Sequence, residues 1–241
     1  MYDRMEVIKE FMEQHNYPAF DLKAVFFDMD GVLFDSMKYH AYAWVRAMRA
    51  SGIPFTEYDC YMNEGRTGDS TINEFSLKYR GREATPQEAE EIYALKSRYF
   101  ESCPEVKPIP HVSSLLKKIK NQGLDIFIVT GSAQKSLLSR LNHNFPGVFS
   151  RDKMVTAFDV KYGKPHPEPY LIALKKARVE PWQALVIENA PLGIRSSVQA
   201  GIFTVAVNTG VLEDKVLSDA GASVVFPNME AVLNHWYKIY E

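Results

Sequence analysis

Short, continuous apolar runs alternate with longer segments in which apolar residues recur at helical spacing. The runs are short enough to be buried parallel strands. They are AVFF (24–27), LDIFIVT (124–130), MVTAF (154–158), ALVIE (184–188), FTVAV (203–207) and SVVF (223–226). Alternation of strand and helix is typical of an α/β protein with a doubly wound parallel sheet, which binds ligands beyond the carboxyl ends of its strands.

One long interval breaks this alternation. Between Met37 and Lys107 the helical pattern continues, in KYHAYAWVRAMRASG and QEAEEIYALKSRYFES for example, but no buried strand is evident. This pattern predicts a helical insert at 37–107 within a sheet domain formed by 21–36 and 108–241. Residues 5–14 have helical spacing too, so 1–20 is predicted to be an N-terminal helical extension.

Composition narrows the range of partners. The chain has 241 residues, of which 46% are hydrophobic and 24% charged, and a formal net charge of −2. Such a balance predicts no binding to nucleic acid and none to anionic membranes. No stretch approaches the roughly 18 apolar residues of a membrane span, and the charged N-terminus lacks the apolar segment of a signal peptide. Cys60 and Cys103 form no metal-type pair. We expect a cytoplasmic monomer.

Carboxylates follow the first apolar run directly, in AVFFDMDGVLFDS (24–36). Asp28 and Asp30 would lie together at a strand end, where mutual repulsion favours a divalent cation between them or a shared proton. A calcium loop is the alternative, but Val32 stands where an EF-hand needs a ligand. Asp35 and Ser36 are expected to shape the exit into the insert rather than to take part in chemistry.

Polar residues also end two later runs and occupy one loop. Thr130 and Gly131 end the second run and offer a hydroxyl and free amides to an anion, although Thr-Gly-Ser is also common in turns. Lys164 lies in the proline-rich loop GKPHPEPY, or is an ordinary surface lysine. Glu188 and Asn189 in VIENAPLGI supply oxygens that would complete a Mg²⁺ site facing Asp28.

These four motifs, in this order, resemble those of the haloacid dehalogenase superfamily of phosphotransferases: DxDGVLxDS, a strand-terminal Thr, GKPxPxxY and E-(D/N)-xxxGI. The helical insert resembles that of the β-phosphoglucomutase-like branch. The resemblance covers residues 21 to about 210. It implies a Rossmann-like core, a mobile helical cap, and Mg²⁺-dependent phosphoryl transfer to or from a small phosphate-containing substrate.

The resemblance also implies a role for each motif. Asp28 would attack phosphorus and form an aspartyl-phosphate, while Asp30 would protonate the leaving group and then activate water. Thr130 and Gly131 would hold phosphoryl oxygens. Lys164, with Mg²⁺, would neutralise the charge that otherwise opposes attack on a phosphate dianion.

Departures from the usual pattern suggest the substrate. Asn189 stands where most relatives have Asp, and Gly68 stands where mutases of the branch place the Arg that binds a distal phosphate. Glu64, in the cap sequence MNEGRTGDS, could restore the missing charge or be a solvated loop residue. Asn189 with Glu64 most resembles the inorganic pyrophosphatases of the branch. The predicted metal ligands are Asp28, Asp30, Asn189, Glu188 and Glu64.

Other residues favour different interpretations. His40 and Trp44 occupy positions where mutases of the branch have His and Trp, although His40 can equally pack within the cap hinge. Lys96 matches a substrate-contacting cap lysine or is an exposed helix charge. A hexose-phosphate phosphatase or β-phosphoglucomutase is therefore the alternative function. A non-catalytic binding protein on the same fold is a second alternative, which retention of the catalytic motifs disfavours.

Overall fold

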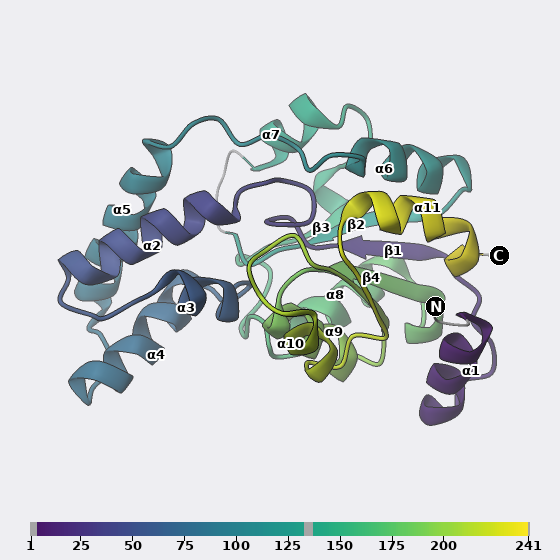
Figure 1. Ribbon diagram of the computed structural model, residues 1–241, viewed down its shortest axis with the longest axis horizontal. Coiled ribbons are helices and arrows are strands. Elements are labelled where there is room, and N and C mark those ends of the chain that lie inside the picture. The colour runs from purple at the N-terminus through teal and green to yellow at the C-terminus, as the bar shows by residue number, and fades with distance from the viewer. Residues whose placement is uncertain (1–3, 133–136, 241) are drawn as a thin grey trace.

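The protein is built around one parallel sheet of six strands in the order β3-β2-β1-β4-β5-β6 (Figure 1). The structure, a computed structural model, describes residues 4–132 and 137–240. The strands are β1 Ala24–Phe27, β2 Asp125–Val129, β3 Met154–Val155, β4 Ala184–Glu188, β5 Phe203–Val207 and β6 Val224–Phe226. The prediction of a doubly wound parallel sheet is confirmed.

The central position of β1 follows from its composition. All four of its residues are buried, so both faces and both edges of the strand must be covered. It pairs with β2 on one side and β4 on the other, and Phe27 is level with Ile128 and Ile187. The residues that follow these three strands therefore lie at the same edge of the sheet.

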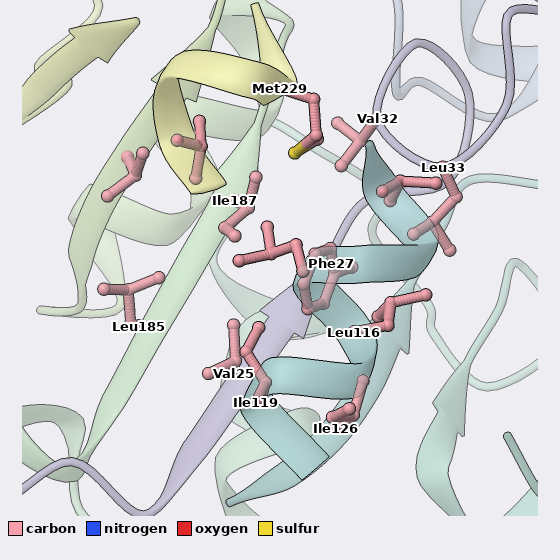
Figure 2. Close-up of a cluster of buried hydrophobic side chains, with 14 of the residues drawn as sticks. Val25, Phe27, Val32, Leu33, Leu116, Ile119, Ile126, Leu185, Ile187 and Met229 are labelled. Carbon is pink, nitrogen blue, oxygen red and sulfur yellow. The ribbon is translucent and has the colours of Figure 1, made fainter. Parts of the chain in front are cut away.

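Apolar clusters fill both faces of the sheet. Figure 2 shows Phe27 of β1 beside Leu116 and Ile119, with Ile187 of β4 next to them. On the opposite face Phe26 packs in a cluster with Tyr170. Successive side chains of a strand point to opposite faces of the sheet. Strand β1 therefore contributes residues to both clusters, which explains why all of its residues are apolar.

Helices cover both faces of the sheet, with α6 and α11 above the strands and α8 and α9 below them in Figure 1. The helix α1, at the end away from α2–α5, packs against the first cluster through Phe11. The helices outside 37–107 are α1 Arg4–His15, α6 Val112–Asn121, α7 Leu137–Asn144, α8 Glu168–Ala177, α9 Pro191–Gln199, α10 Asp214–Asp219 and α11 Met229–Tyr240, with short 3₁₀ helices η1 Arg151–Lys153 and η2 Pro181–Gln183.

Four helices occupy the interval between β1 and β2 and gather at one end of the molecule (Figure 1). They are α2 Met37–Ala50, α3 Glu57–Met62, α4 Gly68–Arg80 and α5 Pro86–Glu101. Helix α5 begins at a capping box formed by Thr85 and Glu88. We call residues 37–107 the cap and 21–36 with 108–241 the core; this division stays a prediction, and the helices agree with it.

Most differences from the predicted elements are in length. Strand β3 ends at Val155 because the amide and hydroxyl of Thr156 both bond to Asp159, which closes a turn. The segment AQKSLLSRLNH (133–143) has the spacing that predicts a helix, and its residues 133–136 lie outside the described part of the chain. Helices α3, α4, α10 and α11 were not predicted. Within the described ranges no helix combines the length and the apolar run needed to cross a bilayer.

Candidate active site

The carboxyl ends of the three central strands bring the predicted motifs together. Asp28 follows β1, Thr130 follows β2, and Glu188 ends β4. The three strands are parallel and in register at Phe27, so these side chains emerge at one edge of the sheet. Buried polar side chains at this edge require partners, and the structure supplies them.

Lys164 is the centre of the buried polar network. Its side chain is 1% exposed, and its ammonium donates to Asp28 Oδ1 at 2.6 Å and to Glu188 Oε1 at 2.6 Å. A third bond, at 2.9 Å, goes to the Val129 carbonyl. Although burial alone lowers the pKa of Lys164, Asp28 and Glu188 together raise it well above its ordinary value. The side chain is therefore an ammonium with all three hydrogens engaged.

Glu188 is fully buried and accepts four hydrogen bonds. Its Oε1 accepts from Lys164 and from the Tyr170 hydroxyl, the latter at 3.1 Å. Its Oε2 accepts from the backbone amides of Asn189 and Ala190. These bonds commit both carboxylate oxygens to protein donors, so direct metal ligation by Glu188 stays a prediction.

Asp28 is a buried carboxyl in a mostly acidic environment. Burial raises its pKa to about 7, an effect that Lys164 opposes and the charges of Glu188 and Asp30 reinforce. A cation at this point would remove the penalty for ionising Asp28.

Asp30 has a different environment, at the hinge between core and cap. Its Oδ1 accepts from the Ser36 hydroxyl at 2.6 Å and lies 3.2 Å from His40 Nε2. Although burial raises the pKa of Asp30, His40, Ser36 and Lys96 bring it to about 2. Ser36 thus contacts a catalytic candidate, whereas Asp35 forms an exposed ion pair with Lys38.

Lys96 and His40 extend this chain into the cap. Lys96 is buried, and its ammonium is 3.0 Å from His40 Nδ1. Both ring nitrogens of His40 have a hydrogen-bond partner when Nδ1 accepts from Lys96 and Nε2–H donates to Asp30. Burial lowers the pKa of His40, with Lys96 adding to the effect. The imidazole also stacks on Phe100, at 4.3 Å between ring centroids, so His40 both packs in the hinge and contacts Asp30.

Glu64 of the cap meets Asn189 of the core. The Asn189 Nδ2 group donates to both Glu64 oxygens, at 3.1 and 3.0 Å. Burial, reinforced by the charge of Asp28, raises the pKa of Glu64 well above its ordinary value. Asn189 Oδ1 is buried with no hydrogen-bond partner. A buried oxygen that lacks a hydrogen-bond partner and lies beside carboxylates is a suitable ligand for Mg²⁺.

The residues present therefore fit a divalent cation, but the predicted ligands do not surround a single point as a complete coordination shell. Within residues 4–132 and 137–240, no three Asp, Glu, His or Cys side chains lie together as a site for an ion. The set Asp28, Asp30, Asn189, Glu188 and Glu64 stays a prediction, of which Asn189 has the free oxygen and Glu64 the contact with it.

Two glycines let the cap lie directly against the core. A Cβ on Gly131 would be 2.6 Å from the carbonyl oxygen of Gly65, and a Cβ on Gly65 would be 2.9 Å from the Lys164 side chain. Gly65 also has φ of +88°, a conformation that glycine adopts without strain. These contacts place the Glu64 loop over the catalytic edge of the sheet.

A pocket with a cavity volume of about 80 Å³ lies between the cap and the core, smaller than most small-molecule sites. Asp28, Asp30, Thr130 and Gly131 line it from the core. Residues of the cap close the other side, among them His40, Trp44, Glu64, Arg66, Tyr93 and Lys96. The hydroxyl oxygen of Thr130 accepts from the Ser132 amide at 3.1 Å, and its hydrogen remains available to a phosphoryl oxygen.

Several residues at the site were not predicted to act there, among them Ser36, Tyr170 and Tyr93. Ser36 and Tyr170 belong to quoted motifs, DxDGVLxDS and GKPxPxxY, so their positions were a usable signal. Tyr93 carries no motif, and only the packing of α5 against α4 brings it to the pocket.

Comparison with known proteins agrees with this geometry. Residues 25–207 match the haloacid dehalogenase-like hydrolase family. The chain is 31% identical over 219 residues to a phosphorylated carbohydrates phosphatase of Thermotoga maritima, covering 88% of this chain and 97% of that one. It is 30% identical over 204 residues to β-phosphoglucomutase of Bacillus subtilis, covering 78% and 84%. A solved structure described as a putative β-phosphoglucomutase from Bacteroides vulgatus is 51% identical, with a TM-score of 0.95 and coverage of 98% and 96%.

The fold, the order of motifs and these matches define a phosphatase of the haloacid dehalogenase-like hydrolases, and the chain belongs to that family. Within it, the chain falls in the β-phosphoglucomutase-like branch. The predicted superfamily and branch are confirmed, whereas placement among the inorganic pyrophosphatases stays a prediction.

The raised pKa of Asp28 predicts a pH dependence of cation binding. Below about pH 7 the metal-free carboxyl is protonated, and the proton must leave before a cation can bind. Mg²⁺ affinity should therefore fall by at least about tenfold for each pH unit below this pKa and level off above it. Calorimetric titration between about pH 5.5 and 8.5 measures this. Asp35→Asn, which removes an exposed carboxylate of the same motif, should leave the profile unchanged; a flat wild-type profile would contradict the assignment.

Proposed function

We propose that the protein is a Mg²⁺-dependent inorganic pyrophosphatase that acts through an aspartyl-phosphate on Asp28. The observation that carries the proposal is the contact of the Glu64 carboxylate with Asn189, which puts a cap carboxylate at the catalytic end of the sheet. The remaining support is the shape of the pocket.

The relatives favour the alternative. Those described above are named for phosphorylated carbohydrates and for β-phosphoglucomutase, so their names support a sugar-phosphate substrate better than pyrophosphate. A hexose-phosphate phosphatase is therefore the second candidate. The two candidate functions use the same phosphoryl-transfer residues. They differ in the size of the substrate that the cap must leave room for.

The cap limits the space next to the catalytic carboxylates. Glu64 lines the pocket and occupies volume that a hexose ring would need close to Asn189. When a cation keeps Glu64 ionised, its carboxylate also adds negative charge, which disfavours any anion that arrives without its own cation. A magnesium complex of pyrophosphate, small and with its charge partly neutralised, suits such a pocket.

Tyr93 limits the pocket further from the cap. A Cβ on Gly68 would be 2.4 Å from the Tyr93 ring, so the ring occupies the place of any side chain at position 68. Mutases of the branch have Arg at this position, for the distal phosphate of the sugar. Here Tyr93 both excludes that arginine and lines the pocket, which favours a substrate without a distant second phosphate.

The first chemical step follows from the arrangement around Asp28. Lys164 holds Asp28 Oδ1, and the second carboxylate oxygen attacks one phosphorus of pyrophosphate. The bridging P–O bond breaks, and the departing phosphate takes a proton from Asp30. Because the pKa of Asp30 is about 2 in the substrate-free site, Asp30 carries this proton only when the negative charge of the bound substrate raises that pKa. Thr130 donates to an oxygen of the transferred phosphoryl group, whose charge Lys164 offsets.

The second step reverses the role of Asp30. Its carboxylate takes a proton from water, the water oxygen attacks the phosphorus, and the acyl phosphate P–O bond breaks to release orthophosphate and free Asp28. His40 and Ser36 both hold Oδ1 of Asp30, which leaves the other oxygen for proton transfer. Mg²⁺, held by Asp28, Asp30 and Asn189 with Glu64, would supply charge neutralisation at the phosphate.

A substrate panel tests the function. With Mg²⁺ present, kcat/KM for pyrophosphate should exceed that for hexose 1- and 6-phosphates by at least about tenfold, because Glu64 and Tyr93 restrict the pocket. Phosphate release from each substrate is the measurement, with Asp28→Asn as the inactive control. Faster turnover of a hexose phosphate would establish the sugar phosphatase instead.

Removing the cap carboxylate tests the role of Glu64. Glu64→Gln keeps the size of the side chain and deletes its charge, so the Mg²⁺ concentration for half-maximal activity should rise about tenfold or more. Direct Mg²⁺ titration of the variant should show the same loss without substrate. The exposed cap residue Glu57, changed to Gln, provides the matched control. An unchanged Mg²⁺ requirement would return Glu64 to a solvated loop role.

Opening the pocket at Tyr93 tests its effect on specificity. Tyr93→Ala should raise the ratio of kcat/KM for hexose 6-phosphate to that for pyrophosphate by about tenfold, since the ring no longer limits substrate size. Tyr99→Ala, on the same helix but outside this pocket, should leave the ratio unchanged. A ratio that stays constant in both variants would show that Tyr93 does not select the substrate.

A further inference from the structure

Tyr170 of α8 is a buried polar side chain that the proposed chemistry does not use. It is 0% exposed and packs in the cluster on the α8 face of the sheet with Phe26. Leucine or phenylalanine would fill such a place without a polar atom. Its hydroxyl instead donates to Glu188 Oε1, the same oxygen that accepts from Lys164.

This shared oxygen connects Tyr170 to the catalytic lysine. Lys164 lies between two carboxylates, Asp28 and Glu188, each 2.6 Å from its ammonium. The ammonium is also 5.2 Å from the centre of the Tyr170 ring, a separation at which the face of an aromatic ring attracts a cation. Tyr170 therefore contacts both partners of the Lys164–Glu188 pair.

The competition between the two carboxylates decides where the lysine charge acts. A donor on Glu188 Oε1 partly neutralises that oxygen and weakens its hold on Lys164. Without the hydroxyl, Glu188 would attract the ammonium more strongly, away from Asp28 and from the phosphoryl oxygens. The effect belongs to the transition state, in which negative charge develops next to Lys164.

We propose that Tyr170 is a positioning residue for phosphoryl transfer, which balances Lys164 between Glu188 and Asp28 by donating a hydrogen bond to Glu188. The inference rests on the proposed aspartyl-phosphate route. The inference concerns only the transferred phosphoryl group, so it applies whatever leaving group the substrate carries.

The effect of Tyr170→Phe follows from this geometry. The variant keeps the ring and its packing and removes only the hydroxyl. The value of kcat should fall about fivefold, as expected for one hydrogen bond, with KM changed by less than about twofold. Inhibition by vanadate, which adopts the five-coordinate geometry of the transferring phosphoryl group, should weaken by the same factor, while inhibition by orthophosphate should not.

The control and the coupled variant complete the test. Tyr162→Phe changes an exposed tyrosine in the loop that carries Lys164 and should leave all these constants unchanged. Because Tyr170 acts through Glu188, the phenylalanine substitution should cost less than about 1.5-fold in kcat when Glu188→Gln is already present. Additive losses in the double variant would overturn the proposal.

The substrate used is the one that wild-type protein turns over fastest in the panel, so failure of pyrophosphate as substrate leaves this test intact. Full activity of Asp28→Asn would refute the aspartyl-phosphate route itself, which is a separate result. If Tyr170→Phe does not fold, Glu188→Gln removes the charge that competes with Asp28 for Lys164, so it must not weaken inhibition by vanadate relative to inhibition by orthophosphate; such a weakening would overturn the proposal. A variant with a lower Tm but unchanged kcat and vanadate inhibition would give Tyr170 a structural role only and overturn the proposal.

Discussion

The buried ammonium of Lys164 is the interaction on which the rest of the site depends. An ionised group with 1% of its side chain exposed is costly unless it is paired, and here two carboxylates and a backbone carbonyl pair it. Asp28 comes from β1, Glu188 from β4, and the carbonyl of Val129 from β2. The three central strands must therefore stay in register for the charge to be compensated, which links the stability of the sheet to its chemistry.

The environments of the two aspartates separate their roles. Burial raises the pKa of Asp28 to about 7 despite its bond to Lys164, so a cation next to Asp28 would favour the carboxylate form that its proposed nucleophilic role needs. Asp30 lies beside His40, Ser36 and Lys96, which outweigh burial and bring its pKa to about 2. The chain Lys96–His40–Asp30 begins in the cap. For the proposed acid–base role of Asp30, the cap therefore supplies residues that set its pKa as well as residues that line the pocket.

At Gly65 and Gly131 the cap and the core are so close that neither position has room for a side chain. That closeness brings Glu64 to Asn189, and the same cap supplies the Tyr93 ring that excludes a side chain at position 68. In the proposed function, substrate choice depends on cap residues that line the pocket together with the phosphoryl-transfer residues. A relative that shares the core motifs can therefore differ in substrate through a few cap side chains.

The sequence alone determined the sheet, the family and the motif residues, because buried parallel strands are continuous apolar runs and catalytic polar residues follow them directly. Asp28, Asp30, Thr130 and Asn189 were predicted as site residues in this way, and Lys164 was predicted from the motif GKPxPxxY. Tertiary structure decided which partners these residues meet: the commitment of Glu188 to Lys164 and Tyr170, the contact of His40 with Asp30, and the wall formed by Tyr93. The bonded partners lie 10 to 24 positions apart in the chain, beyond the range of the local patterns that predict helices and strands. Only the packing of the cap against the core, and of α8 against the sheet, brings them together.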